Sequence, residues 1–443
     1  MVEVKSKGAI NRLGDKIRED GFKVSEPVLQ ELQEYRISHK EALSSVFNTL
    51  CLLTKKLHPT SITTYRLKRF ESIIGKLNRY PKMELSRMWD VAGCRCIVRS
   101  DKEVYKLKEL IGSVLEIKKE YDYIISPQSE GYKSLHLFVG VPDSNKVIEV
   151  QIRNRVDHNW ATLVEISDLL FDAKLKEYGE NKDLLRFHFL LSKKASDLST
   201  HDKYEIAKTI KKDNYFGKLS EVFTRNYLQV RKQWNNIENN INYKYFLIES
   251  RKNEVPKIYP FTNFNEAEVK HFEIYKNTQN ANIVLTHLSS PNYENITIAY
   301  SNYILTFHTF LHECHSILIS LIVEALQKQS YGAFFKMYTL YLELVFNHMD
   351  NLVEEMVEIR NYANVSSKKS RRDLKKEKEW SAHILREVKR NSEHSDKLQK
   401  LVTLNLPSNN FKKLIFEQMV KIILIRYKRR GNRLLKRVKP MTK

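Results

Sequence analysis

The chain has 443 residues, with 75 Lys and Arg against 53 Asp and Glu, so its formal net charge is +22. Hydrophobic residues make up 42% of the chain and aromatic residues 11%, which excludes a wholly disordered or fibrous protein. The 12 glycines and 10 prolines are few for this length, which disfavours an all-β protein and favours a helix-rich one of two or three domains.

Helical and extended patterns alternate in the first part of the chain. The elements predicted there are, in chain order, helices 27–58 and 63–77, strand 91–98, helix 101–115, strands 115–124, 133–141 and 146–152, and helix 153–171. This order predicts an α+β domain over residues 41–180, preceded by an N-terminal helical extension over residues 1–40.

The rest of the chain is predicted to be mainly helical. The elements expected are helices 184–198, 215–241 and 266–278, strand 281–288, and helices 296–303, 308–327 and 331–360. Residues 181–365 therefore form a mainly helical region with a small α/β unit inside it. Residues 366–443 are predicted to be a basic tail of two helices separated by a loop at 404–410.

The positive charge is concentrated in two places. Residues 51–100 carry 11 basic and 3 acidic side chains, and residues 361–443 carry 24 basic and 7 acidic side chains. Concentrated positive charge attracts polyanions such as nucleotides, RNA or an anionic membrane surface. A solvated helix face rich in Lys gives the same pattern, so both interpretations stay open for the tail.

Cysteine spacing and hydropathy bear on the compartment. Cys94 and Cys96 lie two apart in a predicted strand, a poor spacing for a disulfide and not that of a zinc site. The N-terminal residues lack the apolar stretch of a signal peptide, and the apolar runs are shorter than the roughly 18 to 20 residues that span a bilayer. These features predict a cytoplasmic protein without a transmembrane segment.

Cations and a carboxylate stand close together between residues 66 and 95. Arg66, Lys68 and Lys76 suit a triphosphate, because several negative charges must be neutralised at one point. Asp90 precedes the strand predicted at 91–98, a position where a carboxylate can hold Mg²⁺, and Arg95 follows within it. A basic surface patch explains the cations equally well when they are taken alone.

Polar residues also recur within the strands predicted at 133–141 and 146–152. Tyr132 follows Gly131, which allows a tight turn, and its ring could stack on a base. In an extended strand Glu149, Gln151 and Arg153 share one face. Three polar side chains on one face are costly to bury unless that face lines a cleft, although a half-exposed strand is an alternative.

Four segments together resemble the synthetase domain of the RelA/SpoT family of ATP-dependent pyrophosphokinases. They read YRLKRFESIIGKL at 65–77, DVAGCR at 90–95, YDYIISPQSEGYKSLHLFV at 121–139 and IEVQIRNRVDHNWATLVE at 148–165. The resemblance covers roughly residues 45–175. It implies an α+β fold with a mixed, nucleotidyltransferase-like sheet, ATP as the donor and Mg²⁺ as the cofactor.

The resemblance also implies roles for individual residues. Asp90 and Glu149 would hold Mg²⁺, and Glu149 would deprotonate the 3′-hydroxyl of the acceptor. The residues implied for binding ATP are Arg66, Lys68, Lys76 and Arg95, and those implied for binding the acceptor are Tyr132, Lys133, His136, Gln151 and Arg153. The product would be a 3′-pyrophosphorylated nucleotide, as in the synthesis of the alarmone (p)ppGpp in the stringent response.

The acceptor loop departs from the family pattern. Tyr121 and Gln128 replace two expected lysines, and Glu130 adds a negative charge. Three hypotheses follow: an alarmone synthetase acting on a guanosine nucleotide, a toxin or defence enzyme that pyrophosphorylates the 3′-CCA end of tRNA, and an inactive synthetase domain in an RNA- or ribosome-binding protein. The basic tail over 366–443 would contact RNA or the ribosome in the last two.

Two further groups carry weaker predictions. His308, His312 and His315 lie on one helix face beside Cys314, but one helix rarely supplies a complete zinc site. His201 and Asp202 form an HD dipeptide, yet too few residues precede the synthetase segment for the hydrolase domain of the long relatives. We therefore expect neither a zinc site nor alarmone hydrolase activity.

Overall fold

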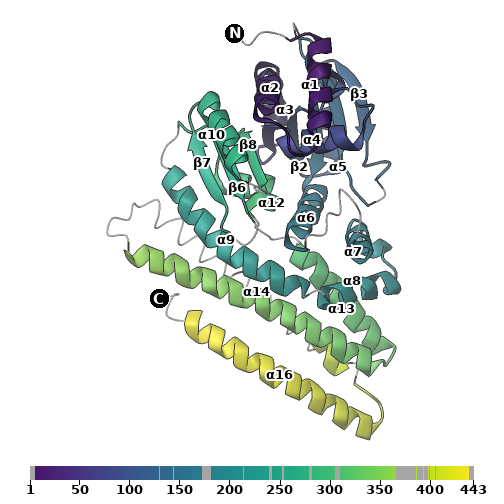
Figure 1. Ribbon diagram of the computed structural model, residues 1–443. Coiled ribbons are helices and arrows are strands. Elements are labelled where there is room, and N and C mark those ends of the chain that lie inside the picture. Colours follow the sequence, from purple (N-terminus) through teal and green to yellow (C-terminus); the bar gives the residue numbers. More distant parts are fainter. Residues whose placement is uncertain are drawn as a thin grey trace. The chain divides into compact units, whose positions relative to one another are not determined.

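The computed structural model places all described strands in one sheet, against which helices of the same unit pack (Figure 1). It describes residues 5–438, except 129, 143, 172–180, 213, 239–241, 252–253, 279–281, 305–309, 405 and most of 366–399. The chain forms two units. Residues 1–169 and 230–306 make up the sheet unit, and residues 170–229 and 307–443 make up the helical unit.

The eight strands are ordered β3-β4-β5-β2-β1-β8-β6-β7. Only β2 and β5 pair in parallel among the described strands, so the sheet is mixed. The strand bounds are β1 Ile62–Leu67, β2 Ala92–Val98, β3 Ile117–Asp122, β4 Leu135–Gly140, β5 Val147–Asn154, β6 Tyr245–Ser250, β7 Lys257–Phe261 and β8 Asn282–Leu288.

One face of the sheet is mainly apolar. Alternate residues of each strand point to this face, for example Leu135, Leu137 and Val139 of β4, all of which are fully buried. They pack against three helices, α3 (Lys40–Leu57), α5 (Asp101–Gly112) and α10 (Phe264–Asn277). Burial of this face fixes the register, because a slip of one residue would turn its apolar side chains to the other side.

The opposite face is divided in two. Next to β8 and β6 it is apolar and covered by the last turns of α9 (Tyr215–Glu238) and by α11 (Tyr293–Ala299) and α12 (Ser301–Ile304). Across β4, β5, β2 and β1 it carries polar side chains, which we call the polar face. Its residues are Arg66, Arg95, His136, Glu149, Gln151 and Arg153.

A second group of helices packs together outside the sheet. Helices α1 (Lys7–Asp20), α2 (Glu26–Ile37) and α4 (Phe70–Arg79) form a separate apolar cluster with the segment around η1 (Leu85–Arg87). Helix α6 (Arg155–Phe171) follows β5 directly. Helices α1, α2 and α4 lie beside the loops that precede α4 and β2.

The helical unit is built around two long helices. Helix α13 (Phe310–Gln327) is followed by α14 (Tyr331–Val365), and α16 (Asn410–Val438) packs along α14. The unit also contains α7 (Lys182–Leu191), η2 (Ala195–Asp197) and α8 (Thr200–Lys212). In the part of the chain that the structure describes, every helix is too short or too polar to cross a membrane. The first helix predicted in the tail lies almost wholly outside the described residues.

Most of the predicted elements are confirmed. Strands β2 to β5 and helices α5, α6, α10 and α14 lie within one to five residues of their predicted bounds, because their alternating or helical apolar patterns are strong. An α+β fold with a mixed sheet and a mainly helical C-terminal region is therefore correct. The single helix predicted at 27–58 is instead two, since the chain turns at Ser38 and His39 between α2 and α3.

The helix predicted over residues 63–77 is wrong in its first half. Residues Ile62–Leu67 form β1, which pairs with both β2 and β8, and α4 begins only at Phe70. The run Ile62, Thr63, Thr64 and Tyr65 is β-branched and aromatic, a composition that favours a central strand. Lys68 therefore lies in a loop, and Lys76 on the following helix.

Strands β6 and β7 were not predicted, and β8 was assigned to a separate small unit. All three extend the same sheet, because β8 pairs with β1 and β6 pairs with β8. The predicted boundary at residue 180 therefore does not coincide with the division in the structure. The chain leaves the sheet unit after residue 169 and re-enters it at residue 230. Pairing between strands more than 200 residues apart leaves no local sequence pattern.

Replacement of Trp234 tests whether the end of α9 belongs to the sheet core. Val230, Trp234 and Ile237 form a buried stripe, and the Trp234 ring lies 5.2 Å from that of Phe246 in β6. Trp234→Ala should lower the free energy of unfolding by about 3–5 kcal/mol because it leaves a large cavity. Phe22→Ala, on an exposed side chain, should change it by less than about 0.5 kcal/mol in the same denaturant titration. Equal effects would contradict this packing.

Candidate active site

A carboxylate shared by two lysines lies where β1 ends and β2 begins. The Lys68 ammonium donates to Oδ2 of Asp90 at 2.8 Å, and the Lys76 ammonium lies 3.0 Å from Oδ1 and 2.9 Å from Oδ2. Burial would raise the pKa of Asp90, but the two lysines outweigh it and lower the pKa to about 2. Asp90 is therefore ionised at neutral pH, and the three groups carry a net positive charge.

The backbone at Lys68 is fixed by a buried ion pair from distant helices. Nε of Arg36 in α2 donates to the Lys68 carbonyl at 2.8 Å, and Nη1 lies 3.6 Å from Glu268 of α10. Gln33 bridges the pair, donating to Glu268 at 2.7 Å and accepting from Arg36. Burial would raise the pKa of Glu268, but Arg36 and its other partners lower it to about 2, so the pair stays charged.

Glu149 lies in the middle of β5, on the polar face. It is in register with Gly93 of β2, where a Cβ atom would lie 3.3 Å from the Glu149 carbonyl oxygen. Nδ1 of His136 contacts Oε1 at 2.9 Å, and the Gln151 amide donates to Oε2 at 3.0 Å. Burial would raise the pKa of Glu149, but its bond with His136 contributes to a net lowering. The nearby charge of Asp90 opposes that lowering and shows that the two carboxylates interact electrostatically.

A chain of hydrogen bonds leads from Glu149 to Arg153. Nε2 of His136 lies 2.8 Å from the Tyr132 hydroxyl, which accepts from Nη2 of Arg153 at 2.7 Å. Burial would lower the pKa of His136, but Tyr132 and Glu149 raise it above its ordinary value of 6.5. Burial would raise the pKa of Tyr132, but Arg153 and His136 lower it to about 8. Each group thus stabilises the charged form of the next.

Three arginines gather on adjacent strands of the polar face. Arg66 comes from β1, Arg95 from β2 and Arg153 from β5. Burial, followed by the charges of Arg153 and Arg66, lowers the pKa of Arg95 to about 10. Nε of Arg153 is buried without a hydrogen-bond partner. Like charges held together with an unsatisfied donor favour a bound anion, because an anion would relieve both costs.

Aromatic rings form a row beside Glu149. Phe138 of β4 is in register with Glu149, and its ring contacts those of Trp89 at 5.9 Å and Tyr121 at 6.0 Å. The Tyr121 ring stacks on that of Tyr123 at 5.9 Å, and Tyr123 contacts His136 at 5.2 Å. Trp89 and Tyr121 are partly exposed, so the row offers a flat surface to a ligand.

The structure brings most of the predicted site residues onto one face. Asp90, Lys68 and Lys76 form one group of contacts, and Glu149, His136, Tyr132, Gln151 and Arg153 form another. Burial raises the pKa of Asp157, and the charge of the predicted acceptor-binding residue Lys133 opposes that rise. Gly131 has a φ of 91°, so the turn before Tyr132 requires a glycine as predicted.

Sequence reasoning missed the supports of this site. Arg36, Gln33 and Glu268 were not singled out, nor were the rings of Trp89 and Phe138. Gln33 and Arg36 stand among Leu32 and Tyr35 on the buried side of α2, and polar residues at such positions are a usable signal. Their partner Glu268 is 235 residues from Gln33 and could not be inferred locally.

Two other groups of metal-binding residue types belong to the helical unit. His201, Asp202 and Glu205 place their ligand atoms within 4.8 Å of one another, but this is a solvent-facing cluster whose carboxylates also pair with Arg186. His315 is buried against the Tyr341 ring at 5.5 Å. The side chains of His308 and His312 lie outside the described residues. The expectation that this helix holds no zinc site therefore stays a prediction.

A face of clustered cations around two ionised carboxylates is typical of enzymes that transfer phosphoryl or pyrophosphoryl groups. Residues 65–171 match the family model described as the region found in RelA / SpoT proteins. GTP pyrophosphokinase YwaC of Bacillus subtilis is 32% identical over 156 residues, which are 32% of this chain and 74% of that protein. The chain thus belongs to the RelA/SpoT family, a family of pyrophosphokinases.

Two further relatives show the extent of the match. Guanosine-3′,5′-bis(diphosphate) 3′-pyrophosphohydrolase of Borreliella burgdorferi is 37% identical over 92 residues, which are 20% of this chain and only 14% of that protein. The crystal structure of the small alarmone synthetase 1 from Bacillus subtilis, bound to its product pppGpp, is 22% identical. The match covers 37% of this chain and 90% of that one, with a TM-score of 0.32.

The contacts of His136 with Tyr132 and Glu149 predict a pH-dependent contribution to stability. Because the folded-state pKa of His136 is raised above 6.5, this contribution is complete below pH 6.5 and is lost as the pH rises through the raised value. His136→Gln should cost roughly 1.5–3 kcal/mol of unfolding free energy at mildly acidic pH and clearly less at alkaline pH.

The matched control is the same substitution in a Glu149→Gln background, which removes the partner charge. There the difference between the two pH values should shrink, because the coupling between the residues is gone. A pH difference of the same size in both backgrounds would show that His136 responds to some other group.

Proposed function

We propose that the protein is an ATP-dependent pyrophosphokinase that transfers the β,γ-pyrophosphate of ATP to the 3′-hydroxyl of a guanosine nucleotide. The observation that carries this proposal is the meeting of five cations and two ionised carboxylates on one side of the sheet. Lys68 and Lys76 border Asp90, while Arg66, Arg95 and Arg153 share the polar face with Glu149. The relatives named GTP pyrophosphokinase support the choice of acceptor.

The cations are suited to a triphosphate. Without nucleotide, Lys68 and Lys76 neutralise Asp90, and three guanidinium groups repel one another nearby. A polyphosphate would pair with these cations and stabilise the charge that develops on its β- and γ-phosphates during transfer. The two lysines would then exchange a carboxylate for phosphate oxygens.

Glu149 is suited to orient the acceptor. Its lowered pKa keeps it ionised at neutral pH, and His136 and Gln151 fix its carboxylate. In the proposed step the 3′-oxygen bonds to the β-phosphorus while the bond from that phosphorus to the α,β-bridging oxygen breaks. AMP leaves, and Glu149 receives the hydroxyl proton.

The donor set fits Mg²⁺. Asp90 and Glu149 are ionised, close enough to repel one another, and offer the hard oxygens that this cation prefers. The two residues would hold the ion, which would supply charge neutralisation at the phosphates when bound. Because both oxygens of Asp90 contact lysines, the proposal requires those lysines to move towards the nucleotide.

A second acceptor class is favoured by one observation. Tyr121, which replaces an expected cation, belongs to the row of rings beside Glu149 rather than to a phosphate-binding group. Rings stack on unpaired bases but contribute no charge for 5′-phosphates. The 3′-CCA end of tRNA is therefore the alternative acceptor, and such an activity would block translation.

Labelled-product analysis tests the reaction. The full-length protein is incubated with γ-³²P-ATP and Mg²⁺ together with GDP, GTP or deacylated tRNA, and the products are resolved. Glu149→Gln should lower kcat by about 10² to 10⁴, because it removes the group that receives the proton. Asp90→Asn should lower it as well.

Glu120→Gln provides a matched control, because Glu120 pairs with Lys108 on the surface of the domain. It should retain kcat. Label in a guanosine nucleotide supports the first acceptor, and label only in tRNA supports the second. An absence of label in all three, with folded protein, would favour an inactive synthetase domain and refute the proposed activity.

Tyr121→Lys tests what sets the choice of acceptor. A cation at this position would restore a partner for 5′-phosphates, which is worth about 1–3 kcal/mol. The ratio of kcat/KM for GTP to that for tRNA should therefore rise by roughly tenfold or more. Tyr80→Lys, which adds the same charge at an exposed position on the end of α4, should leave the ratio unchanged. An unchanged ratio in both variants would exclude Tyr121 as a determinant.

A further inference from the structure

Helix α16 has a buried side that is held firmly against α14. Phe416, Val420, Tyr427 and Leu434 are buried on this side. The Phe416 ring contacts Phe334 at 5.1 Å, and the Tyr427 ring contacts Phe346 at 5.1 Å. Arg430 pairs with Asp350, and Arg437 pairs with Glu354 at 2.6 Å. The helix is therefore attached along its length, with a defined side left outward.

The outward side of its first four turns is apolar. Phe411 is 71% exposed and Ile422 is 66% exposed, the largest values in the stripe. Each residue of this stripe has another member three or four positions away, so they share one side of the helix. We call them the outer stripe, and they are Phe411, Leu414, Ile415, Met419, Ile422 and Ile425.

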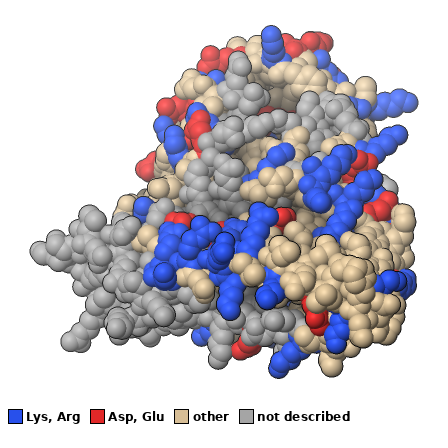
Figure 2. All heavy atoms as spheres, turned by 90° about the horizontal axis from the view of Figure 1, so that it is seen from below, with Lys and Arg blue, Asp and Glu red and all other residues tan. Residues whose placement is uncertain are grey.

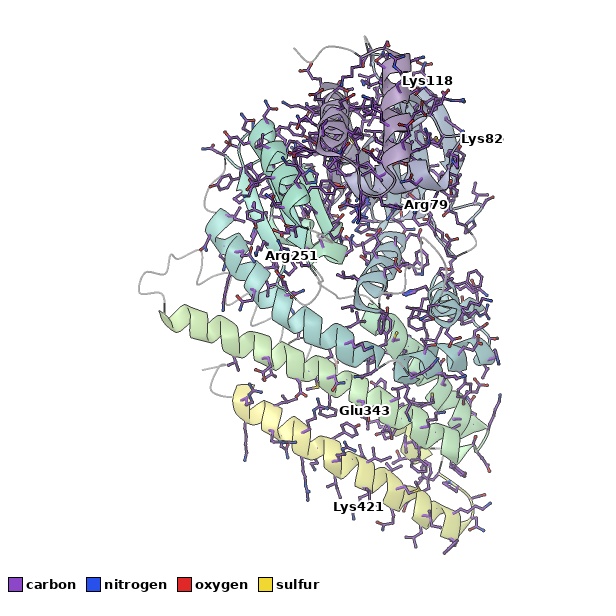
Figure 3. All side chains as sticks on the ribbon, viewed as in Figure 1. Arg79, Lys82, Lys118, Arg251, Glu343 and Lys421 are labelled. Atoms are coloured by element: carbon purple, nitrogen blue, oxygen red, sulfur yellow. The ribbon has the colours of Figure 1, made fainter. Side chains whose placement is uncertain are left out.

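Cations border the outer stripe. Residues 410–438 contain ten Lys and Arg but a single acidic residue, Glu417. Lys421 and Lys428 are exposed on one flank, and Figure 3 shows Lys421 on the side of α16 that faces away from α14. Arg429 and Arg433 continue the outward side beyond the stripe and are exposed. Figure 2 shows Lys and Arg gathered in a band beside an area with few charged side chains.

We propose that α16 is a docking surface for an anionic lipid membrane, on which it lies parallel to the plane. An apolar stripe with cations at its borders is the pattern of an interfacial helix, because the stripe enters the acyl boundary while the cations remain at the phosphates. The helix is too polar to span a bilayer, which is consistent with a position on the surface.

A lipid surface accounts for both the apolar stripe and the cations beside it, whereas RNA accounts for the cations alone. RNA phosphates would pair with the cations, but five of the six stripe residues are aliphatic or Met and offer no ring for stacking. A protein partner would need an apolar groove lined by acidic residues to match the exposed cations. A membrane that contains anionic lipid provides an apolar interior and a continuous negative surface together.

Vesicle flotation of the full-length protein tests this proposal. Vesicles of phosphatidylcholine are compared with vesicles that also contain phosphatidylglycerol, at low and high salt. The protein should float with the anionic vesicles, and high salt should weaken the binding. Phe411→Ser with Ile422→Ser should reduce the bound fraction at least about tenfold. Arg429→Gln with Arg433→Gln should reduce it and weaken its dependence on salt.

The matched control is Phe22→Ser with Ile125→Ser, two side chains of the same types that are 71% and 74% exposed outside α16. It should float like the wild type. Both outer-stripe side chains face away from α14, and an unchanged thermal midpoint confirms that the variant remains folded. The proposal is overturned if the wild type does not float. It is also overturned if the Phe411→Ser, Ile422→Ser variant floats as well as the Phe22→Ser, Ile125→Ser control. The proposal is also overturned if the protein does not float but binds RNA, or associates with itself, through the outer-stripe residues and the arginines.

Discussion

Two lysines share one carboxylate at the start of β2, and the candidate site depends on this arrangement. Asp90 holds Lys68 and Lys76 in place, while Lys68 is itself fixed through its carbonyl by Arg36. Arg36 is buried and needs the charge of Glu268, which α10 supplies from far along the chain. An isolated buried charge would be strongly destabilising, so the loop that carries Lys68 requires both the N-terminal helices and the second segment of the sheet unit.

The sheet explains why the site lies where it does. Its apolar face must be buried on α3, α5 and α10, which leaves the alternate residues of β4, β5, β2 and β1 on the other side. Among the described residues, helices α9, α11 and α12 cover that other side next to β8 and β6 and reach Ile62 of β1 and Ile97 of β2. The charged residues of neighbouring strands therefore face one region, where parallel pairing of β2 with β5 places Gly93 beside Glu149. The same alternation that builds the core thus assembles the polar face.

Local patterns predicted the central part of this arrangement. Strands β2 to β5 were found because their apolar and polar residues alternate, and Glu149, Gln151 and Arg153 were placed on one face for the same reason. Residue types between 66 and 95 indicated a phosphate site even though Ile62–Leu67 was taken for a helix. The supports at Arg36 and Glu268 and the pairing of β1 with β8 were missed, because each joins segments separated by more than 200 residues.

The net charge of +22 illustrates what the sequence determines and what only tertiary packing determines. The sequence alone established that the charge is concentrated near residue 70 and in the tail, and that the first cluster belongs to a RelA/SpoT synthetase segment. It could not establish which side of α16 is buried, because both sides contain apolar residues. Packing of Phe416 and Tyr427 against α14 decided that question and left an apolar stripe outward among the cations. Periodicity records which residues share a side of a helix, whereas only tertiary contacts determine which of those sides meets solvent.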